Sequence, residues 1–492
     1  MKKIKAKILS FIEKIPQPSN WKFWLGLALI VKTAFFIYLL KDKSTINEHY
    51  LETFALDGGD SISYIEPIEN LLANGEYFDD HRMPGYGWLY FLLRLFMPLS
   101  LALNATVILQ LILSSLSVYV LALCSIRLFK HNYYFYTTFI LYCISTYVSL
   151  FETSLLTESF CTSALIFSFF FVLNEHKNKY FIFLSGLFLT WSFFLKPVLV
   201  PLIILFAAYV LLNISSPFKL TKLNWKKMLF FLIPFLLIDG SWIIRNYNKY
   251  ERIIPLTKSI YYEGYNEGFE LELFKFMQAF GGSIVHWNPG SEITFFKPAP
   301  SHIKRKIEVT FPENIYTSKF NYDSLLTLQK QTQKFQNNAT SIEQKEILLN
   351  QIRSRLDTYT LSIKQERPFL YYVSSRFKIM KTFFLHSGTY NLFSKPSFEL
   401  TKIEFLVKIF YSLLYLFVIV FGILGSFRMI IRKKINLTFL LISFTALYIS
   451  LVFPIMLKLD EFRYLVPGYP FLLLSSIYML HKTITIFNKK NG

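Results

Sequence analysis

Long runs of apolar residues alternate along the chain with short polar segments, a pattern typical of a protein that crosses a membrane many times. A helix needs about 20 mostly apolar residues to span a bilayer. The run 180–213 is divided at Lys196-Pro197, because proline cannot continue a helix and the undivided run is too long for one span. The expected spans are 22–41, 103–126, 133–149, 156–173, 180–195, 197–213, 228–246, 404–426, 436–455 and 464–481. The pattern therefore predicts an all-α polytopic membrane protein with about ten transmembrane helices.

The composition agrees with this pattern and excludes several classes of protein. Of the 492 residues, 53% are apolar, 18% are aromatic and only 17% are charged, whereas soluble proteins contain about 25% charged residues. These values exclude a disordered chain, a collagen and an ordinary cytosolic enzyme. The three cysteines, Cys124, Cys143 and Cys161, lie in apolar runs and imply no disulfide framework.

Membrane topology accounts for much of the net charge of +20. With the N-terminus in the cytoplasm, the short cytoplasmic segments hold 21 Lys and Arg but only two acids, Glu13 and Glu175. The Lys and Arg residues of the short outer loops are only Lys196, Lys458 and Arg463. Because cytoplasmic loops carry an excess of Lys and Arg, we expect a multi-pass protein of the plasma (inner) membrane with both termini in the cytoplasm. No nucleic-acid partner is needed to explain the charge.

Three parts of the chain follow from this topology. Residues 1–247 form an N-terminal transmembrane module that includes a first outer loop at 42–102. Residues 248–403 form a soluble outer domain, which we expect to be mixed but mainly helical, with an amphipathic helical pattern over 323–386. Residues 404–492 form the C-terminal transmembrane helices.

Ionisable residues gather at the outer ends of the predicted spans. Two are carboxylates beside the fourth span, Glu152 and Glu158, and three are cations from separate parts of the chain, Lys196, Arg245 and Arg463. Charges at membrane depth are costly and mark functional candidates. Cations at this depth could hold a lipid-linked phosphate, and a nearby carboxylate could act as a general base. Interfacial anchoring is the alternative for any single cation, but it does not require carboxylates beside the cations.

Two further charges, Lys32 and Asp239, lie deeper in the predicted spans. Lys32 would either extend toward the interface or pair with a carboxylate. Asp239 would form an ion pair with Arg245 inside the bundle. Neither needs a catalytic role.

The first outer loop contains Asp57-Gly-Gly-Asp60 followed by a predicted helix from Ser61. Tyr64 lies one turn after Asp60 on the same helix face, and Asp60 could also serve only as the N-cap. Arg82 precedes a rigid Pro-Gly-Tyr turn that would hold its guanidinium near the membrane. This loop therefore supplies two candidate carboxylates and one cation.

Taken in order, several short motifs resemble those of the GT-C superfamily of polyprenol-phosphate-sugar-dependent glycosyltransferases. The resemblance covers almost the whole chain and is strongest to family 39-like bacterial members, which include aminoarabinose transferases and protein O-mannosyltransferases. Its specificity comes from the order of the motifs and their common side. The motifs are Asp60-x-x-x-Tyr64, Gly75-Glu-Tyr77, Arg82-x-Pro-Gly-Tyr86, Leu156-Thr-Glu158, Lys196-Pro197, Trp242-Ile-Ile-Arg245-Asn246, the segment 367–383 and Glu461-Phe-Arg463-Tyr464.

The resemblance implies a catalytic carboxylate in the first outer loop, which maps to Asp60, with Asp57 as the competitor. It implies a second acidic residue in the next outer loop, either Glu152 or Glu158. The substrate-binding residues it implies are Asp57, Tyr64, Arg82, Lys196, Arg245, Arg463 and Tyr464. Related enzymes often carry adjacent Asp-Glu in the first loop, whereas this chain has Asp-Gly-Gly-Asp, which leaves the acceptor class open.

The expected function is that of an inverting membrane glycosyltransferase, with a polyprenyl-phosphate sugar as donor and a lipid, glycan or protein hydroxyl as acceptor on the outer face. No metal cluster with ligand spacing occurs in the sequence, and no cofactor is required; a divalent metal is an option that the sequence does not indicate. A lipid or glycan transporter or flippase is one alternative, although paired repeats and midplane charges are not evident. An O-antigen ligase or polymerase shares the architecture, but the acidic first loop argues against it. A structural scaffold does not explain the charges at the outer face.

Overall fold

The computed structural model describes residues 16–42, 53–77, 82–212, 223–257, 268–297 apart from 287 and 289, 307–337, 341–393, 397–432 and 436–490. Within these ranges the chain is helical and forms no strand, only isolated bridges at Leu56–Ser154 and Thr317–Phe320. The prediction of an all-α chain is confirmed for this part. The chain forms two compact units: a first unit of Met1–Thr257, Ser387–Ile449 and Leu465–Gly492, and a second unit of Lys258–His386 and Ser450–Tyr464.

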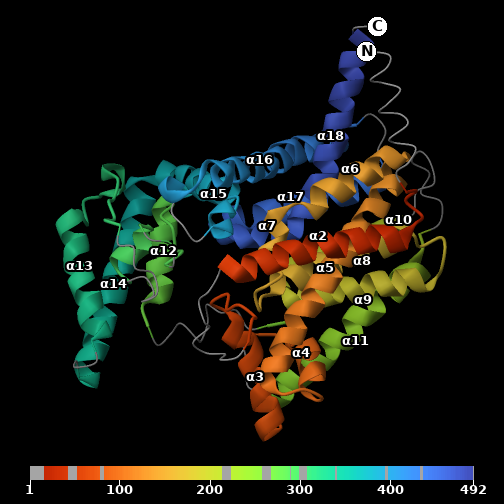
Figure 1. Ribbon diagram of the computed structural model, residues 1–492. Helices are drawn as coiled ribbons and strands as arrows, with labels where there is room; N and C mark the ends of the chain where they lie inside the picture. Colours follow the sequence, from red (N-terminus) through yellow and green to blue (C-terminus); the bar gives the residue numbers. More distant parts are fainter. Residues whose placement is uncertain are drawn as a thin grey trace. The chain divides into compact units, whose positions relative to one another are not determined.

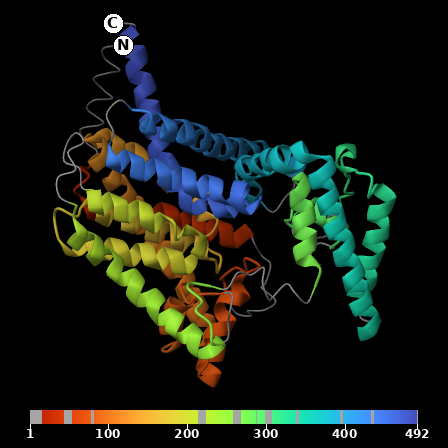
Figure 2. The same ribbon diagram turned by 180° about the vertical axis from the view of Figure 1, so that it is seen from behind.

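The first unit is a bundle of long apolar helices. Within it, α2 packs on α5, α5 on α8, α8 on α9 and α9 on α11, while α16 packs on α18 (Figures 1 and 2). The helices are α2 Trp21–Asp42, α3 Ser61–Asn74, α4 Gly87–Arg94, α5 Leu99–Phe129, α6 Asn132–Cys143, α7 Thr146–Ser149, α8 Thr157–Leu173, α9 Tyr180–Leu195, α10 Leu202–Leu212, α11 Trp225–Tyr250, α16 Lys402–Ile430, α17 Leu437–Leu451 and α18 Tyr469–Lys490, with short 3-10 turns at Pro197–Leu199, Thr389–Leu392 and Ser397–Glu399.

Five helical segments of the described residues are long and apolar enough to cross a bilayer, which supports a membrane protein. They are Trp21–Leu40, Leu99–Phe129, Trp225–Tyr250, Lys402–Ile430 and Leu437–Leu457. Each coincides with a predicted span. The other five predicted spans fall on helices that are shorter, interrupted or more polar, so the total of ten stays a prediction.

Two predicted spans differ from the observed helices. The segment 133–149 is broken because α6 ends at Cys143, and Ser145 adopts an extended backbone before α7 begins. Serine and threonine make local hydrogen bonds that compete with a helix, and the Ser149 hydroxyl donates to the Ser145 carbonyl at 3.2 Å. The segment 464–481 begins as a 3-10 turn, Phe462–Gly468, and α18 starts only after it.

Small residues allow α16 and α18 to approach closely. A Cβ atom added at Gly422 or Gly425 would collide with the α18 backbone at Leu472 or Ser475. The Ser426 hydroxyl donates to the Ser475 hydroxyl at 3.0 Å across the same contact. This is the packing expected where apolar helices associate without a hydrophobic driving force between them.

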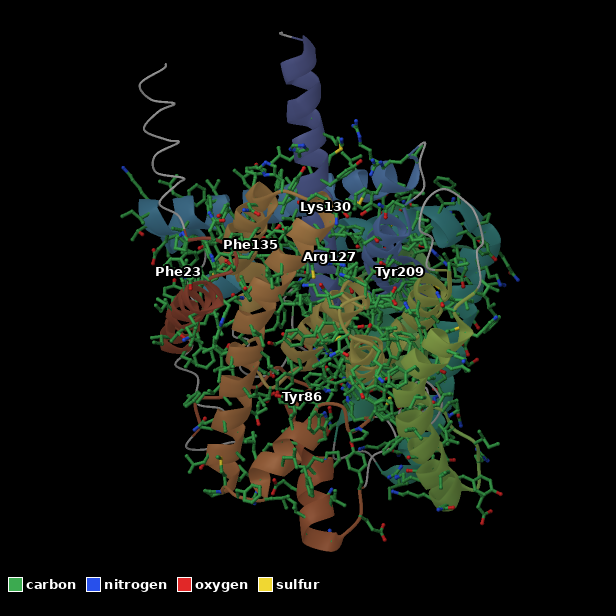
Figure 3. All side chains as sticks on the ribbon, turned by 90° about the vertical axis from the view of Figure 1, so that its right-hand side faces the viewer. Phe23, Tyr86, Arg127, Lys130, Phe135 and Tyr209 are labelled. Atoms are coloured by element: carbon green, nitrogen blue, oxygen red, sulfur yellow. The ribbon has the colours of Figure 1, made fainter. Side chains whose placement is uncertain are left out.

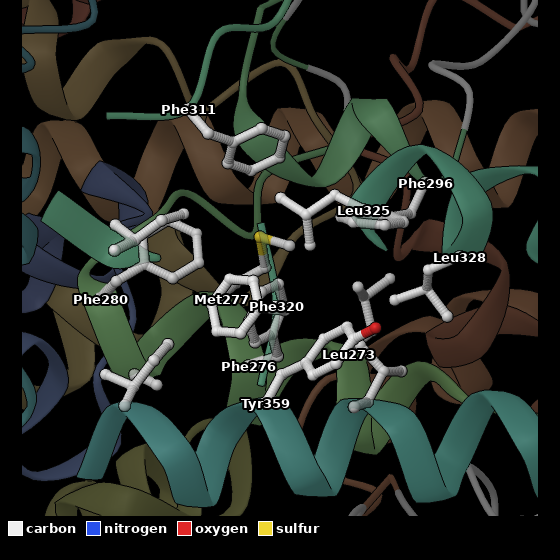
Figure 4. Close-up of a cluster of buried hydrophobic side chains, with 14 of the residues drawn as sticks. Leu273, Phe276, Met277, Phe280, Phe296, Phe311, Phe320, Leu325, Leu328 and Tyr359 are labelled. Atoms are coloured by element: carbon white, nitrogen blue, oxygen red, sulfur yellow. The ribbon is translucent and has the colours of Figure 1, made fainter. Parts of the chain in front are cut away.

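The second unit has its own hydrophobic core, in which Leu273, Phe276, Met277 and Phe280 of α12 meet Tyr359 of α14 (Figure 4). The predicted amphipathic stretch 323–386 forms several helices in place of one. The elements of the unit are α12 Glu270–Phe280, α13 Tyr322–Gln336, α14 Ile342–Glu366, a π-helical turn η4 Leu370–Ser374, α15 Ser375–Leu385, a second π-helical turn η7 Val452–Leu457, and 3-10 turns at Glu292–Phe295 and Glu313–Ile315.

Candidate functional site

The first outer loop is hydrogen-bonded to the loop that precedes α8. The Leu56 N–H donates to the Thr153 carbonyl at 2.9 Å, and the Leu155 N–H donates to the Leu56 carbonyl at 3.0 Å. The Ser61 hydroxyl, in the first turn of α3, donates to the Leu155 carbonyl at 3.0 Å. These bonds place the Asp57–Asp60 turn beside the start of α8, where Glu158 lies in the first helical turn.

A second turn, Arg82 to Tyr86, is fastened to the end of α9. The Trp191 indole N–H donates to the Gly85 carbonyl at 2.8 Å. A Cβ atom on Gly85 would collide with the Phe194 backbone, so glycine is required for this close approach. The contact brings Arg82 toward Lys196, the C-cap residue of α9.

Two ion pairs result from this arrangement. The Arg82 Nη2 atom lies 3.4 Å from Asp60 Oδ1, and both side chains are partly exposed. The Lys196 Nζ atom lies 2.8 Å from Glu158 Oε1, and this pair is buried. Glu158 at a helix N-terminus and Lys196 at a helix C-terminus are each favoured by the helix dipole, which is the local reason for their positions.

Asp60 occupies the N-cap position of α3, but its side chain makes no capping hydrogen bond. Asp60 therefore contacts Arg82 in place of the N-cap hydrogen bond that the sequence suggested as the alternative. Asp57 has a different position: its Oδ1 atom accepts the Gly59 N–H at 2.8 Å and shapes the turn. Gly59 has a φ of +83° there, which favours glycine. Of the two aspartates, Asp60 is thus the one paired with a cation.

Tyr64 joins the two ion pairs into one cluster. The Arg82 guanidinium lies 4.5 Å from the centre of the Tyr64 ring. Burial raises the pKa of the Tyr64 hydroxyl, Arg82 and Lys196 lower it, and Asp60 and Glu158 raise it further. Because Ser61 bonds to Leu155 and Trp191 bonds to Gly85, the five predicted site residues lie at the same end of the bundle.

Glu152 lies in a separate environment from Glu158. Its Oε1 atom is 2.6 Å from Lys32 Nζ, and both side chains are fully buried. The hydroxyls of Ser114 and Ser149 add two further contacts, with Ser114 donating to Glu152 at 2.5 Å and Ser149 accepting from Lys32 at 2.9 Å. Of the two expectations for Lys32, pairing with a carboxylate is the one that the structure shows.

Gln110 connects this buried ion pair to the candidate site. Its side-chain N–H group donates to the carbonyls of Glu152 at 3.1 Å and Ser154 at 2.9 Å. Its oxygen accepts the Tyr86 hydroxyl at 3.0 Å, and the Tyr86 ring lies 5.4 Å from that of Tyr64. Sequence reasoning missed Gln110, although an amide inside the apolar run 103–126 was a signal that could have revealed it.

The candidate site lies well away from the basic residues predicted to be cytoplasmic. Figure 3 shows Arg127 and Lys130, in the last turn and at the C-cap of α5, near one end of the bundle, and Tyr86 toward the other end. All of these residues belong to the first unit, so the separation is a property of that unit. It is the arrangement that the positive-inside rule leads us to expect for an outer site.

Arg245 reaches the cluster through Tyr77. The guanidinium donates to the Tyr77 carbonyl and lies 4.7 Å from the Trp242 ring, while the Tyr77 hydroxyl donates to the Arg82 carbonyl at 2.9 Å. The expected ion pair with Asp239 does not form among the described residues, because six residues along a helix place the two side chains about 120° apart. Asp239 instead accepts the Leu256 N–H at 3.0 Å.

Arg463 and Tyr464 belong to the second unit. Arg463 pairs with Glu461, and its guanidinium lies 5.3 Å from the Tyr464 ring centre. In the same loop, burial raises the pKa of Asp460. The predicted clamp of Lys196, Arg245 and Arg463 draws on both units and stays a prediction.

No family model matches the chain, and no curated protein matches it. Among solved structures, it is similar to the oligosaccharyltransferase of Archaeoglobus fulgidus in the apo form, with a TM-score of 0.45 and 12% sequence identity. The similarity covers 94% of this chain and 52% of the other, so the chain spans about half the length of that protein. This level of similarity does not assign the chain to a family.

The cluster offers acid–base chemistry beside positive charge. Asp60 is partly exposed and could accept a proton, while Lys196 and Arg82 could hold an anion. Within the described ranges, no group of three or more His, Cys, Asp or Glu side chains is placed to hold a metal ion.

Proposed function

We propose that the chain is an integral membrane glycosyltransferase that moves a sugar from a polyprenyl-phosphate donor to an acceptor hydroxyl on the outer face of the membrane. The acceptor is a lipid, a glycan or a protein. The observation that carries the proposal is the gathering of the Asp60–Arg82 and Glu158–Lys196 pairs around Tyr64. The order of the sequence motifs supports the same assignment.

In the proposed reaction, the Asp60 carboxylate takes the proton of the acceptor hydroxyl. The acceptor oxygen then attacks the anomeric carbon, the bond from that carbon to the phosphate oxygen breaks, and the configuration inverts. The polyprenyl phosphate leaves with the bonding electrons, and Lys196, Arg245 and Arg463 stabilise its charge. Glu158 would orient Lys196 through their ion pair.

The direct test is release of polyprenyl phosphate from a labelled polyprenyl-phosphate sugar by the purified chain in nanodiscs. Asp60→Asn keeps the size of the side chain and removes the proton acceptor, so we expect turnover to fall by about 10²–10⁴. Asp57→Asn is the matched control, because Asp57 shapes the turn and an amide oxygen can still accept the Gly59 N–H. If Asp57→Asn abolishes turnover while Asp60→Asn is active, the base has been assigned to the wrong residue.

A second candidate, a lipid or glycan transporter or flippase, is favoured by one observation. The Lys32–Glu152 pair is fully buried among α2, α5 and the loop before α8, and buried ionisable pairs in membrane bundles often lie on transport pathways. Vesicles that contain the purified chain would distinguish the two. A transporter moves intact donor across the bilayer without cleaving it, whereas a transferase releases polyprenyl phosphate.

A further inference from the structure

A stripe of exposed aromatic side chains runs along one face of η4 and α15 in the second unit. Phe369, Tyr372 and Phe377 are 72%, 53% and 65% exposed. Phe377 follows Phe369 by eight positions, which in a regular helix places it about 80° away. The π-helical turn adds one residue, which reduces this angle by about 100°. The rings of Phe369 and Phe377 therefore lie on nearly the same face. The buried residues of η4 and α15 are Leu370, Ser375, Ile379 and Phe383.

The same stretch is purely basic. Residues 367–398 contain no Asp or Glu, and the flanking acids are Glu366 and Glu399. Its cations within the described helices include Arg376 and Lys381, of which Lys381 is exposed. Aromatic rings beside cations, with no acids, are typical of a helix that lies on a bilayer surface.

The position of the stretch agrees with that reading. Within the second unit, α15 packs against η7, and the Lys458 Nζ atom lies 4.7 Å from the Tyr371 ring centre. The η7 turn is the end of the apolar span Leu437–Leu457, and Met456 on it is 72% exposed. The helix α15 therefore packs on residues that end an apolar segment long enough to cross a bilayer.

We infer that the exposed face of residues 367–385 binds anionic phospholipid headgroups at the bilayer surface. Phe369, Tyr372 and Phe377 enter the interface, while Arg376 and Lys381 contact lipid phosphates. This surface holds the second unit against the membrane. It goes beyond the proposed glycosyl transfer and does not depend on that reaction.

The test uses the full chain in vesicles with an environment-sensitive fluorophore attached to an introduced cysteine. Phe377→Cys reports on the stripe, and Leu361→Cys, at a 53% exposed apolar position on α14, is the matched control. The three native cysteines are buried, so the unsubstituted chain serves as the labelling blank. Quenching is measured with nitroxide lipids and with a water-soluble quencher.

We expect the label at position 377 to be quenched by nitroxide lipids roughly twofold more in vesicles of phosphatidylcholine with phosphatidylglycerol than in phosphatidylcholine alone. The label at position 361 should respond mainly to the aqueous quencher in both. Replacing Arg376 and Lys381 by glutamine should remove the dependence on phosphatidylglycerol. Equal aqueous quenching at the two positions would overturn the inference. Lipid quenching that appears only after polyprenyl phosphate is added would also overturn it, because it would indicate a donor site.

Discussion

The buried ion pair of Lys32 and Glu152 allows a quantitative prediction about which carboxylates are structural. At 2.6 Å, two unit charges attract each other by about 6 kcal/mol with an effective dielectric constant of 20. Both side chains are fully buried, so removing one partner leaves the other charge uncompensated, at a cost of about 3–5 kcal/mol. We therefore expect Lys32→Met to destabilise the chain strongly.

The double variant Lys32→Met with Glu152→Gln removes both charges and keeps an oxygen that can accept the Ser114 hydroxyl. Replacing a buried pair by neutral groups is often close to neutral, so much of the lost stability should return. The measurement is the melting temperature of each purified variant in the same detergent. At about 2 °C per kcal/mol, the single variant should melt about 6–10 °C lower than the native chain.

Turnover per folded molecule separates a structural pair from a catalytic one. If Glu152 is structural, the double variant should keep a rate within about threefold of the native rate, since general-base loss would cost about 10²–10⁴. Normal melting of Glu152→Gln together with a large loss of turnover would refute this reasoning. Glu152 would then be the second acidic residue of the reaction.

Three further expectations follow from contacts at or near the site. Gly85→Ala should lower the free energy of unfolding by about 1–3 kcal/mol, measured by thermal unfolding, because the α9 backbone that its Cβ would meet is rigid. Gly59→Val is the comparison, because its Cβ would meet no atom and only the backbone conformation is strained. Arg245→Ala should lower donor affinity or turnover about 30-fold in a donor titration, and Lys196→Arg should be milder than Lys196→Ala; unchanged donor affinity would rule out the clamp. Burial lowers the pKa of Lys458 from 10.5 to about 8. Between these two pH values the unfolded chain therefore binds more protons than the folded chain. The melting temperature should rise with pH above 8, and the rise should be smaller in Lys458→Met.

The helical architecture was largely predictable because apolar run length is a local property of the sequence. Where prediction failed, residues that disfavour a helix altered it: Ser145 interrupts the span expected at 133–149, and Pro467 lies in the 3-10 turn that precedes α18. Such breaks depend on hydrogen bonds that a hydropathy pattern does not record. The second unit shows the same limit, since the amphipathic pattern over 323–386 indicated helix but gave no sign of the π-helical turn η4.

The choice between Glu152 and Glu158 illustrates what the sequence left open at the site. Both acids lie near the start of the same helix, six positions apart, and their local sequences give no reason to separate them. The structure separates them by their partners, Lys32 on α2 for Glu152 and Lys196 on α9 for Glu158. Which lysine pairs with each glutamate depends on how the helices pack, and a motif of three or four residues does not encode that packing.

The candidate site is held together by contacts between residues that are far apart in the chain. Ser61 reaches Leu155 across 94 positions, and Trp191 reaches Gly85 across 106. Each contact joins a short turn in the first outer loop to the end of a bundle helix, and the bundle helices themselves carry Glu158 and Lys196. The rigid bundle therefore fixes one ion pair, while the docked loop adds Asp60 and Arg82 to it. A substitution that loosens only the turns carrying Asp60 and Arg82 should impair turnover before it impairs folding, because the bundle helices keep their own packing when those turns move.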